Sequence, residues 1–129
     1  MTIAEASKQF GITSDTLRYY ERIGLLPPVT RSKSGIRDYS EEDLKWIEFI
    51  KCMRSAGIGI EALIEYVKLF FQGDSTIEAR ENILKEQREL LVEKINITQG
   101  TLARLDQKIS WYGENIKAFD KEFNKNNKK

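Results

Sequence analysis

Histidine is absent from this chain, and cysteine occurs once, at Cys52. Without histidine there is no imidazole for acid–base catalysis, for metal ligation or for a pH switch near neutrality. A single cysteine excludes an intramolecular disulfide and an all-cysteine zinc site within one chain. The sequence also has no glycine-rich phosphate loop and no pairing of a nucleophile with a base. We therefore expect no metal site, no cofactor and no enzymatic activity.

Long apolar runs and an excess of one charge are also missing. The longest stretch without a charged residue is nine residues, 95–103, whereas a membrane-spanning helix needs about 20. The first residues include neither a basic segment nor an apolar one, so we expect no signal peptide, no membrane partner and a cytoplasmic protein. The net charge is only +1, so any affinity for nucleic acid must come from a local cluster.

Proline is rare, since only Pro27 and Pro28 occur, and with Gly35 they mark one non-helical stretch over about 24–40. A short two-stranded segment is expected within 28–40. The rest of the 129 residues is expected to be mainly α-helical. Helices are predicted over 2–9, 14–23, 41–55 and 60–71, and from about 75 onward.

Capping residues support three of these helix starts. A hydroxyl-bearing residue precedes apolar periodicity at Thr2, Ser40 and Ser75, and each is followed three positions later by an acid, as in a capping box. Gly59 precedes another helix without a side-chain cap, so that start is expected to be weaker.

The last predicted helix contains two interleaved seven-residue ladders that begin at Ile77 and Glu81. Their offset is that of the a and d positions of a coiled coil, polar at first and apolar from Leu91 onward. An isolated helix with this stripe would expose apolar surface to water, so we predict a homodimer, with folding back onto the same chain as the alternative. The expected dimerisation residues are Leu84, Leu91, Ile95, Leu102, Leu105 and Ile109. The heptads alone do not distinguish parallel from antiparallel pairing.

The predicted domain boundaries follow from these elements. Residues 1–72 are expected to form the first domain, and residues 73–123 the dimerisation helix with a short last helix that begins after Gly113. The segment 124–129, rich in lysine and asparagine, is expected to be disordered.

The first two predicted helices, joined by a turn at Gly11, have the spacing of a helix-turn-helix. Arg18 and Tyr19 lie off the apolar face of the second helix, and Arg31 and Lys33 add basic residues in the following loop, which is typical of a β-hairpin wing. Guanidinium and phenol groups suit contacts with phosphates and base edges, so this pattern predicts binding to double-stranded DNA. Two alternatives remain, a helical domain whose arginines are merely solvated and a coiled-coil adaptor that does not bind DNA.

Several segments, in order, resemble the MerR family of transcriptional regulators. They are IAEA at 3–6, GITSDTLRYYERIGLLP at 11–27, GIRDY at 35–39 and DL at 43–44. The resemblance implies a winged helix-turn-helix head and an antiparallel coiled-coil dimerisation helix. It also implies a palindromic promoter site whose DNA is bent and untwisted, so that RNA polymerase is affected indirectly through the DNA.

The same resemblance implies the DNA-contacting residues. Two lie on the recognition helix, Arg18 and Tyr19, and two lie in the wing, Arg37 and Tyr39. Ser14 is a further candidate at the helix N-terminus, where backbone N–H groups favour phosphate.

Cys52 is the candidate effector-sensing residue. The segment FIKCMRSAG at 49–57 resembles the single-cysteine NmlR/AdhR-like subgroup, which is linked to reactive aldehydes, carbonyls and nitrosative stress. A thiolate is a soft nucleophile that reacts with such compounds. The alternative is a constitutive regulator in which Cys52 is purely structural, since free cysteines often pack as small hydrophobes.

Overall fold

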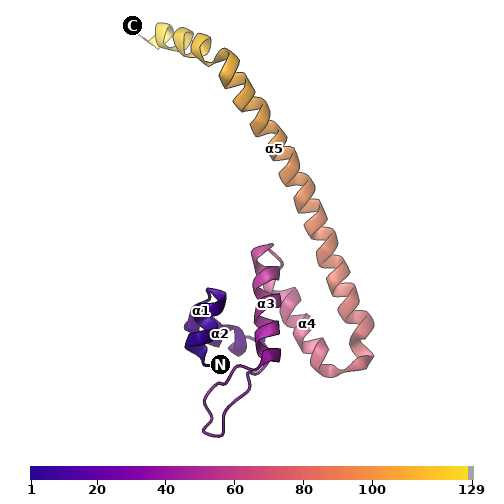
Figure 1. The fold of residues 1–129 in the computed structure, drawn as a ribbon. Coiled ribbons are helices and arrows are strands. Elements are labelled where there is room, and N and C mark those ends of the chain that lie inside the picture. Colours follow the sequence, from indigo (N-terminus) through magenta and orange to yellow (C-terminus); the bar gives the residue numbers. More distant parts are fainter. Residues whose placement is uncertain (128–129) are drawn as a thin grey trace. The chain divides into compact units, whose positions relative to one another are not determined.

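The computed structural model describes the backbone of residues 1–127 and the side chains of residues 1–115. Helices are the dominant elements (Figure 1). They are α1 (Ile3–Phe10), α2 (Ser14–Arg22), α3 (Glu41–Ser55), α4 (Ile60–Gln72) and α5 (Ile77–Asn127), with a 3-10 turn, η1 (Asp74–Thr76), before α5. The mainly α-helical fold predicted from the sequence is confirmed, and each predicted helix start lies within two residues of the observed one. The chain has two compact units, Met1–Leu91 and Val92–Lys129, whose boundary lies within α5.

Short-range capping defines α1 and its turn into α2. The Thr2 hydroxyl accepts the N–H of Glu5 at 3.1 Å, and the Glu5 carboxylate accepts the N–H of Thr2 at 3.2 Å, which completes the predicted capping box. Gly11 then ends α1 with φ of 65°, a left-handed conformation that favours glycine. These two local signals fix the start and the end of the first helix.

The core of the first unit is apolar and continuous. Helices α1 and α2 contribute Ala6 and Leu17, both fully buried, and the chain after α2 adds Leu25 and Leu26. Residues from α3, α4 and the connecting segments complete it: Val29, Tyr39, Ile47, Ile50, Ile58 and Leu63. The core therefore holds both helices of the helix-turn-helix and the segment that follows them against α3.

The segment between α2 and α3 is not the two-stranded wing that the sequence predicted. Within the described residues it contains one isolated antiparallel bridge, between Arg31 and Arg37, and a tight turn in which Ser32 N–H donates to Ile36 O at 2.8 Å. The residues on both sides of this turn are mostly polar and exposed, and no neighbouring strand offers them further backbone pairing. We call residues 30–38 the basic loop.

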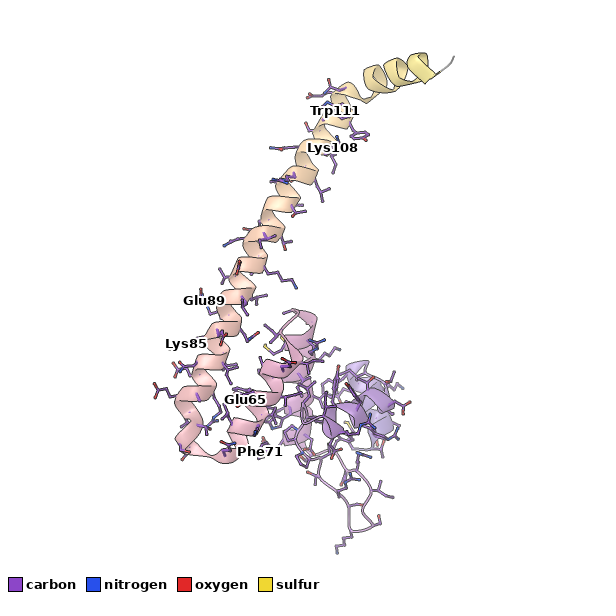
Figure 2. The ribbon with its side chains drawn as sticks, turned by 180° about the vertical axis from the view of Figure 1, so that it is seen from behind. Glu65, Phe71, Lys85, Glu89, Lys108 and Trp111 are labelled. Atoms are coloured by element: carbon purple, nitrogen blue, oxygen red, sulfur yellow. The ribbon has the colours of Figure 1, made fainter. Side chains whose placement is uncertain are left out.

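The turn between α4 and α5 also differs from the expected cap. Ser75 lies within η1, and Thr76 takes the structural role instead, since its hydroxyl lies 2.6 Å from Leu69 O and 2.8 Å from Gly73 O. The Arg80 guanidinium donates to the Thr76 hydroxyl at 3.1 Å. The chain therefore enters α5 through hydrogen bonds centred on Thr76, next to the exposed Phe71 at the end of α4 (Figure 2).

Helix α5 is continuous through Gly113, which corrects the predicted break at that residue. One glycine costs a helix only about 1 kcal/mol relative to alanine, and helical neighbours on both sides outweigh it. The helix also includes residues 124–127 of the expected disordered tail, while residues 128–129 lie outside the described part of the chain. None of the described helices is both long and apolar enough to cross a membrane.

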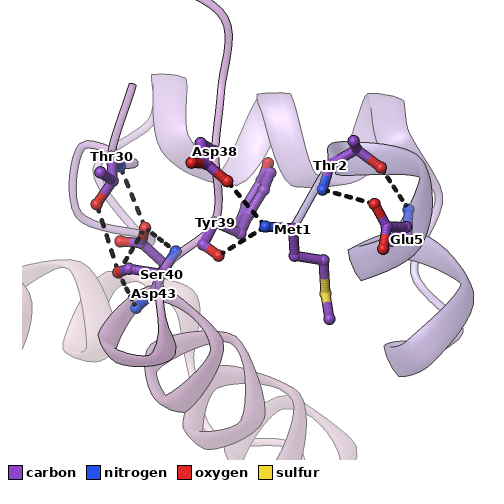
Figure 3. Close-up of polar contacts among 8 residues, drawn as sticks. All are labelled: Met1, Thr2, Glu5, Thr30, Asp38, Tyr39, Ser40 and Asp43. Carbon is purple, nitrogen blue, oxygen red and sulfur yellow. Dashed lines mark hydrogen bonds and ion pairs between the residues drawn. The ribbon is translucent and has the colours of Figure 1, made fainter. Parts of the chain in front are cut away.

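Asp43 connects the start of α3 to the basic loop (Figure 3). Its Oδ2 atom accepts the N–H of Ser40 at 2.9 Å, the hydroxyl of Ser40 at 2.9 Å and the N–H of Thr30 at 3.1 Å. Burial raises the pKa of Asp43, but the hydrogen bonds from Ser40 and Thr30 outweigh it, so the pKa lies below its ordinary value. The carboxylate is thus a buried, charged acceptor for two segments of the chain.

We expect Asp43→Asn to lower the free energy of unfolding at pH 7 by about 1–2 kcal/mol, because the hydrogen bonds to a charged acceptor are lost or weakened. The depressed pKa stabilises the folded state above about pH 4, the ordinary carboxyl value, and this contribution is lost as the pH falls through the folded pKa. The difference between wild type and variant should therefore shrink towards pH 3. Urea unfolding followed by circular dichroism at both pH values measures it.

Glu42→Gln is the matched control, since Glu42 lies in the same first turn but is exposed, with Lys45 at 3.5 Å as its ion-pair partner. Its stability should stay within about 0.5 kcal/mol of wild type at both pH values. An Asp43→Asn protein that is as stable as this control at pH 7 would contradict the assignment.

Candidate nucleic-acid interface

Helix α2 presents one apolar and one polar face. The Thr13 hydroxyl caps the helix by accepting the N–H of Thr16 at 3.1 Å, and Leu17 anchors the inner face in the core. On the outer face the Arg18 side chain is 47% exposed and Tyr19 is 44% exposed. Both residues predicted for the recognition helix are therefore accessible from solvent.

The arginines on the outer face of α2 contact neighbouring side chains, and an incoming ligand can replace these partners. Arg18 donates to Asp15 at 3.0 Å, and the Asp15 side chain is almost fully exposed. The guanidinium carbon of Arg22 lies 5.4 Å from the centre of the Tyr19 ring. Exposed ion pairs of this kind contribute at most about 1 kcal/mol, so a phosphate can displace Asp15 from Arg18.

Ser14 occupies the first residue of α2 and is half-buried. The N-terminal cap is Thr13, whose hydroxyl is already used by Thr16. Backbone N–H groups in the first turn of a helix favour an anion, so the position of Ser14 fits the phosphate contact expected of it.

The basic loop places Arg31 and Lys33 on the surface. Arg31 donates to Gly35 O at 3.2 Å, across the turn, and Gly35 has φ of 83°, which a residue with a side chain rarely adopts. Lys33 lies exposed near the tip of the same turn. The loop thus presents two cations on a short, internally hydrogen-bonded turn.

Glu21 joins the basic loop to α2, and the sequence analysis did not identify it. One carboxylate oxygen accepts the N–H of Val29 at 3.1 Å, and the other accepts Nε of Arg37 at 2.8 Å. The second arginine of the loop, Arg31, lies 3.8 Å from the same carboxylate. Only 13% of the Glu21 side chain is exposed. The helix and the loop are thus connected by one partly buried carboxylate.

Two of the predicted contact residues lie deeper than expected. The Arg37 side chain is 25% exposed, and its Nε is engaged by Glu21, so only the rest of the guanidinium is accessible. Tyr39 is 3% exposed, and no described group forms a hydrogen bond with its hydroxyl. Burial raises the pKa of the Tyr39 phenol, with the positive charge of Arg37 opposing that rise. The surface position expected for Tyr39 is corrected: its ring belongs to the core.

The burial of Tyr39 has a local cause. Its N–H donates to Met1 O at 2.7 Å, and its carbonyl accepts the N-terminal ammonium of Met1 at 3.3 Å (Figure 3). These bonds hold the backbone beside the N-terminal segment. The next residue, Ser40, is the N-cap of α3. With both flanks fixed, the Tyr39 ring packs into the core instead of extending towards solvent.

Cys52 lies on the solvent-exposed part of α3. Its carbonyl accepts the hydroxyl of Ser55 at 2.8 Å and the N–H of Ala56 at 3.3 Å, so these bonds involve its backbone only. Met53, the next residue, packs against the core. Cys52 is thus exposed in the single chain, contrary to the burial that the structural alternative assumed.

The predicted dimerisation residues share high exposure. Leu84, Ile95, Leu102, Leu105 and Ile109 are between 40% and 68% exposed, and Leu91 is half-buried. Leu84 and Leu91 lie in the first unit, and the other four lie in the second. The stripe is therefore not covered within either unit.

Glu21→Gln tests the connection between α2 and the basic loop. We expect about a five- to tenfold loss of DNA affinity, because the neutral amide no longer holds Arg37 and Arg31 in place. Asp15→Asn is the matched control: it removes one negative charge from the same helix, but from an exposed side chain. It should leave affinity unchanged or raise it, since Arg18 is released.

Fluorescence anisotropy with one duplex and one salt concentration measures both variants. If net charge alone determined DNA affinity, both variants would bind DNA more tightly by the same factor, because each loses one negative charge. Equal gains would therefore contradict the structural role of Glu21.

Comparison with known proteins agrees with this geometry. Residues 1–69 match the family model of the MerR HTH family regulatory protein. The chain is 68% identical over 93 residues to the HTH-type transcriptional regulator AdhR of Bacillus subtilis, a match that spans 72% of this chain and 66% of AdhR. That relative is named as a transcriptional regulator, in agreement with the expectation that the chain is not an enzyme.

Solved structures of the same family share the fold. A MerR family transcriptional regulator from Listeria monocytogenes is 47% identical, with a TM-score of 0.86 over 98% of this chain and 96% of that chain. HiNmlR, described as a MerR family regulator that lacks the sensor domain and is bound to promoter DNA, is 30% identical, with a TM-score of 0.81 over 88% of this chain and 90% of that chain. This chain therefore belongs to the MerR family of helix-turn-helix, DNA-binding transcriptional regulators.

Proposed function

We propose that this regulator binds a palindromic promoter site as a homodimer and controls transcription by distorting the DNA between its two heads. The single observation that supports this most directly is the exposed basic surface formed by α2 and the basic loop, which Glu21 holds together. A helix that carries Arg18 and Arg22, beside a positively charged loop, suits the major groove and the adjacent phosphates.

The residues predicted to contact DNA have distinct roles in this proposal. Arg18 and Tyr19 contact base edges and phosphates from α2, and Ser14 contacts phosphate at the start of that helix. Arg31 and Lys33 contact the backbone beside the groove. Arg37 contacts DNA with the part of its guanidinium that Glu21 leaves free, whereas Tyr39 is enclosed by the core and is assigned no DNA contact.

The homodimer supplies the symmetry that a palindromic site requires. The apolar stripe of α5 is exposed within each unit, and pairing two copies along it removes that surface from water. Two-fold symmetric regulators contact half-sites about 34 Å apart or at multiples of that distance. The comparison with HiNmlR adds that a protein of this fold binds promoter DNA.

Control of transcription then follows from DNA shape. Contacts at two half-sites offset the energy of bending and untwisting the intervening DNA, and that energy depends on its sequence. RNA polymerase is affected indirectly, through the altered geometry of the promoter. A coiled-coil adaptor that does not bind DNA would not explain the exposed basic residues of α2 and the basic loop. A measurement of DNA binding therefore distinguishes the regulator from the adaptor.

Arg18→Ala should weaken binding to promoter DNA and reduce the slope of log affinity against log salt by about 1, because one phosphate contact is lost. Lys51→Ala is the control, an exposed lysine on α3 outside the proposed interface, and it should leave the slope unchanged. Anisotropy titrations at several salt concentrations give both slopes. An Arg18→Ala protein with the wild-type affinity and slope would contradict the interface.

For the signal, we propose that a reactive aldehyde adds to Cys52. The thiol sulfur forms a bond to the carbonyl carbon, the C=O π electrons move to oxygen, and the thiol proton is transferred to that oxygen, giving a hemithioacetal. Cys52 is exposed on α3, and the adjacent Met53 packs on the core. An adduct on this helix can therefore alter how α3 packs against α4 and change the spacing of the two heads.

Cys52→Ser should abolish the transcriptional response to aldehyde while leaving basal DNA affinity within about twofold of wild type, since the side chain is exposed. Ser55→Ala, on the same helix, is the control and should keep the response. In vitro transcription with and without a small aldehyde, paired with intact-protein mass spectrometry, measures both. A Cys52→Ser protein that still responds would refute the sensor role and leave a constitutive regulator.

A further inference from the structure

We infer that the groove between the end of α2, the two prolines and α4 binds a small monocarboxylate with an apolar chain or ring. The groove lies within the first unit and has a volume of about 650 Å³, which is within the usual range for small-molecule sites. Ten residues line it, whereas an interface with a protein partner takes about 20–30 residues on each side. Its size therefore favours a small molecule.

The walls of the groove are mainly apolar. Its apolar side chains are Leu26, Pro27, Pro28, Ile64, Val67 and Phe71. The first three follow α2, and the other three lie on α4. Phe71 is 60% exposed near the end of α4 (Figure 2), so a ligand beside its ring would remove apolar surface from water.

The wall that follows α2 is held in place before any ligand binds. The N–H groups of Leu25 and Leu26 both donate to Tyr20 O at 3.0 Å. The N–H of Val29 donates to the Glu21 carboxylate at 3.1 Å. The two prolines between these points have fixed φ angles. A groove with a fixed backbone loses little conformational entropy on binding, which favours affinity for a small ligand.

Two cations in the lining give the groove a preference for an anion. Arg22 ends α2 and Lys68 lies on α4, and both side chains are exposed. No ion pair within the described part of the chain involves either of them. The one acid in the lining, Glu21, already has Arg37 at 2.8 Å and Arg31 at 3.8 Å. The uncompensated charge of the groove is therefore positive.

The charges favour a monocarboxylate over a phosphate ester. A guanidinium can donate two parallel hydrogen bonds to one carboxylate, so Arg22 alone can orient it. A phosphate ester carries about 1.5–2 negative charges at pH 7, and the Glu21 carboxylate in the same lining repels the additional charge. The apolar walls then select the body of the ligand, which is an alkyl chain or an aromatic ring.

Arg22 belongs both to this groove and to the outer face of α2. It follows Tyr19 by three residues and Arg18 by four, so the three side chains share one face of the helix. Its guanidinium carbon lies 5.4 Å from the centre of the Tyr19 ring. One consequence rests on the proposed function: a carboxylate and a DNA phosphate compete for this guanidinium, so ligand and DNA each weaken the binding of the other.

Isothermal titration calorimetry of the full chain without DNA tests the site, with octanoate as the probe. We expect a Kd on the order of 0.1 mM, and binding at least about tenfold weaker for octanamide, which lacks the charge, and for acetate, which lacks the chain. Arg22→Ala, Lys68→Ala and Phe71→Ala should each weaken octanoate binding about fivefold, because each removes one contact.

Lys51→Ala and Ile77→Ala are the matched controls, since both residues are exposed and lie outside the groove. They should bind octanoate as tightly as wild type does. The absence of octanoate binding, or equal affinity for octanamide, overturns the site. Octanoate binding that all three groove variants retain at the wild-type affinity also overturns it.

Fluorescence anisotropy with one promoter duplex tests the competition. Octanoate at about ten times its Kd should weaken DNA binding by wild type about fivefold, whereas acetate at the same concentration, which matches the ionic strength, should not. Lys68→Ala, measured with and without octanoate at that concentration, should lose only about twofold. Octanoate binding that leaves DNA affinity unchanged overturns the competition at Arg22 and supports the site alone. Because the calorimetry contains no DNA, a chain that fails to bind DNA overturns the proposed function and not the site.

Discussion

The exposed apolar stripe along α5 is the constraint on which the rest of the protein depends. Each leucine or isoleucine that moves from water into an interface contributes about 1.5–3 kcal/mol, so several such residues along one helix strongly favour pairing. The predicted dimerisation residues are 40–68% exposed, apart from the half-buried Leu91. In the proposed homodimer, a second copy of the helix removes this surface from water and, by symmetry, brings two DNA-binding heads into one assembly.

One partly buried carboxylate, Glu21, and one buried carboxylate, Asp43, give each head a defined geometry. Glu21 connects α2 to the basic loop, and Asp43 connects the same loop to the start of α3. Both accept backbone N–H groups as well as side-chain donors, so they fix the path of the chain as well as its charges. A loop without a sheet can therefore still present Arg31 and Lys33 in a constant position relative to Arg18.

The helices and their caps were predictable from sequence because their signals are local. The capping boxes at Thr2 and Ser40, and the left-handed Gly11, act over three or four residues. The roles of Glu21 and Tyr39 were not predictable, because they depend on contacts between segments that lie 8 to 38 residues apart. A signal for Glu21 did exist: it is an acid on the recognition helix, followed by a loop with two arginines that need a counter-ion.

Two other differences between the predicted and the observed structure, in the wing and in α5, have local causes. The predicted wing reduces to one bridge because its polar residues have no neighbouring strand, and α5 passes Gly113 because one weak helix former does not outweigh its helical neighbours. The basic residues are few, with six against four acids in the first 40, so DNA affinity depends on their placement and not on their number.

Sedimentation equilibrium of the full chain mixed with a short symmetric promoter duplex tests the central claim most directly. The proposal predicts a free protein of twice the 15.0 kDa chain mass and a complex that contains two chains per duplex. A free protein that stays at the mass of one chain, together with one chain per duplex or no complex at low salt, would contradict it.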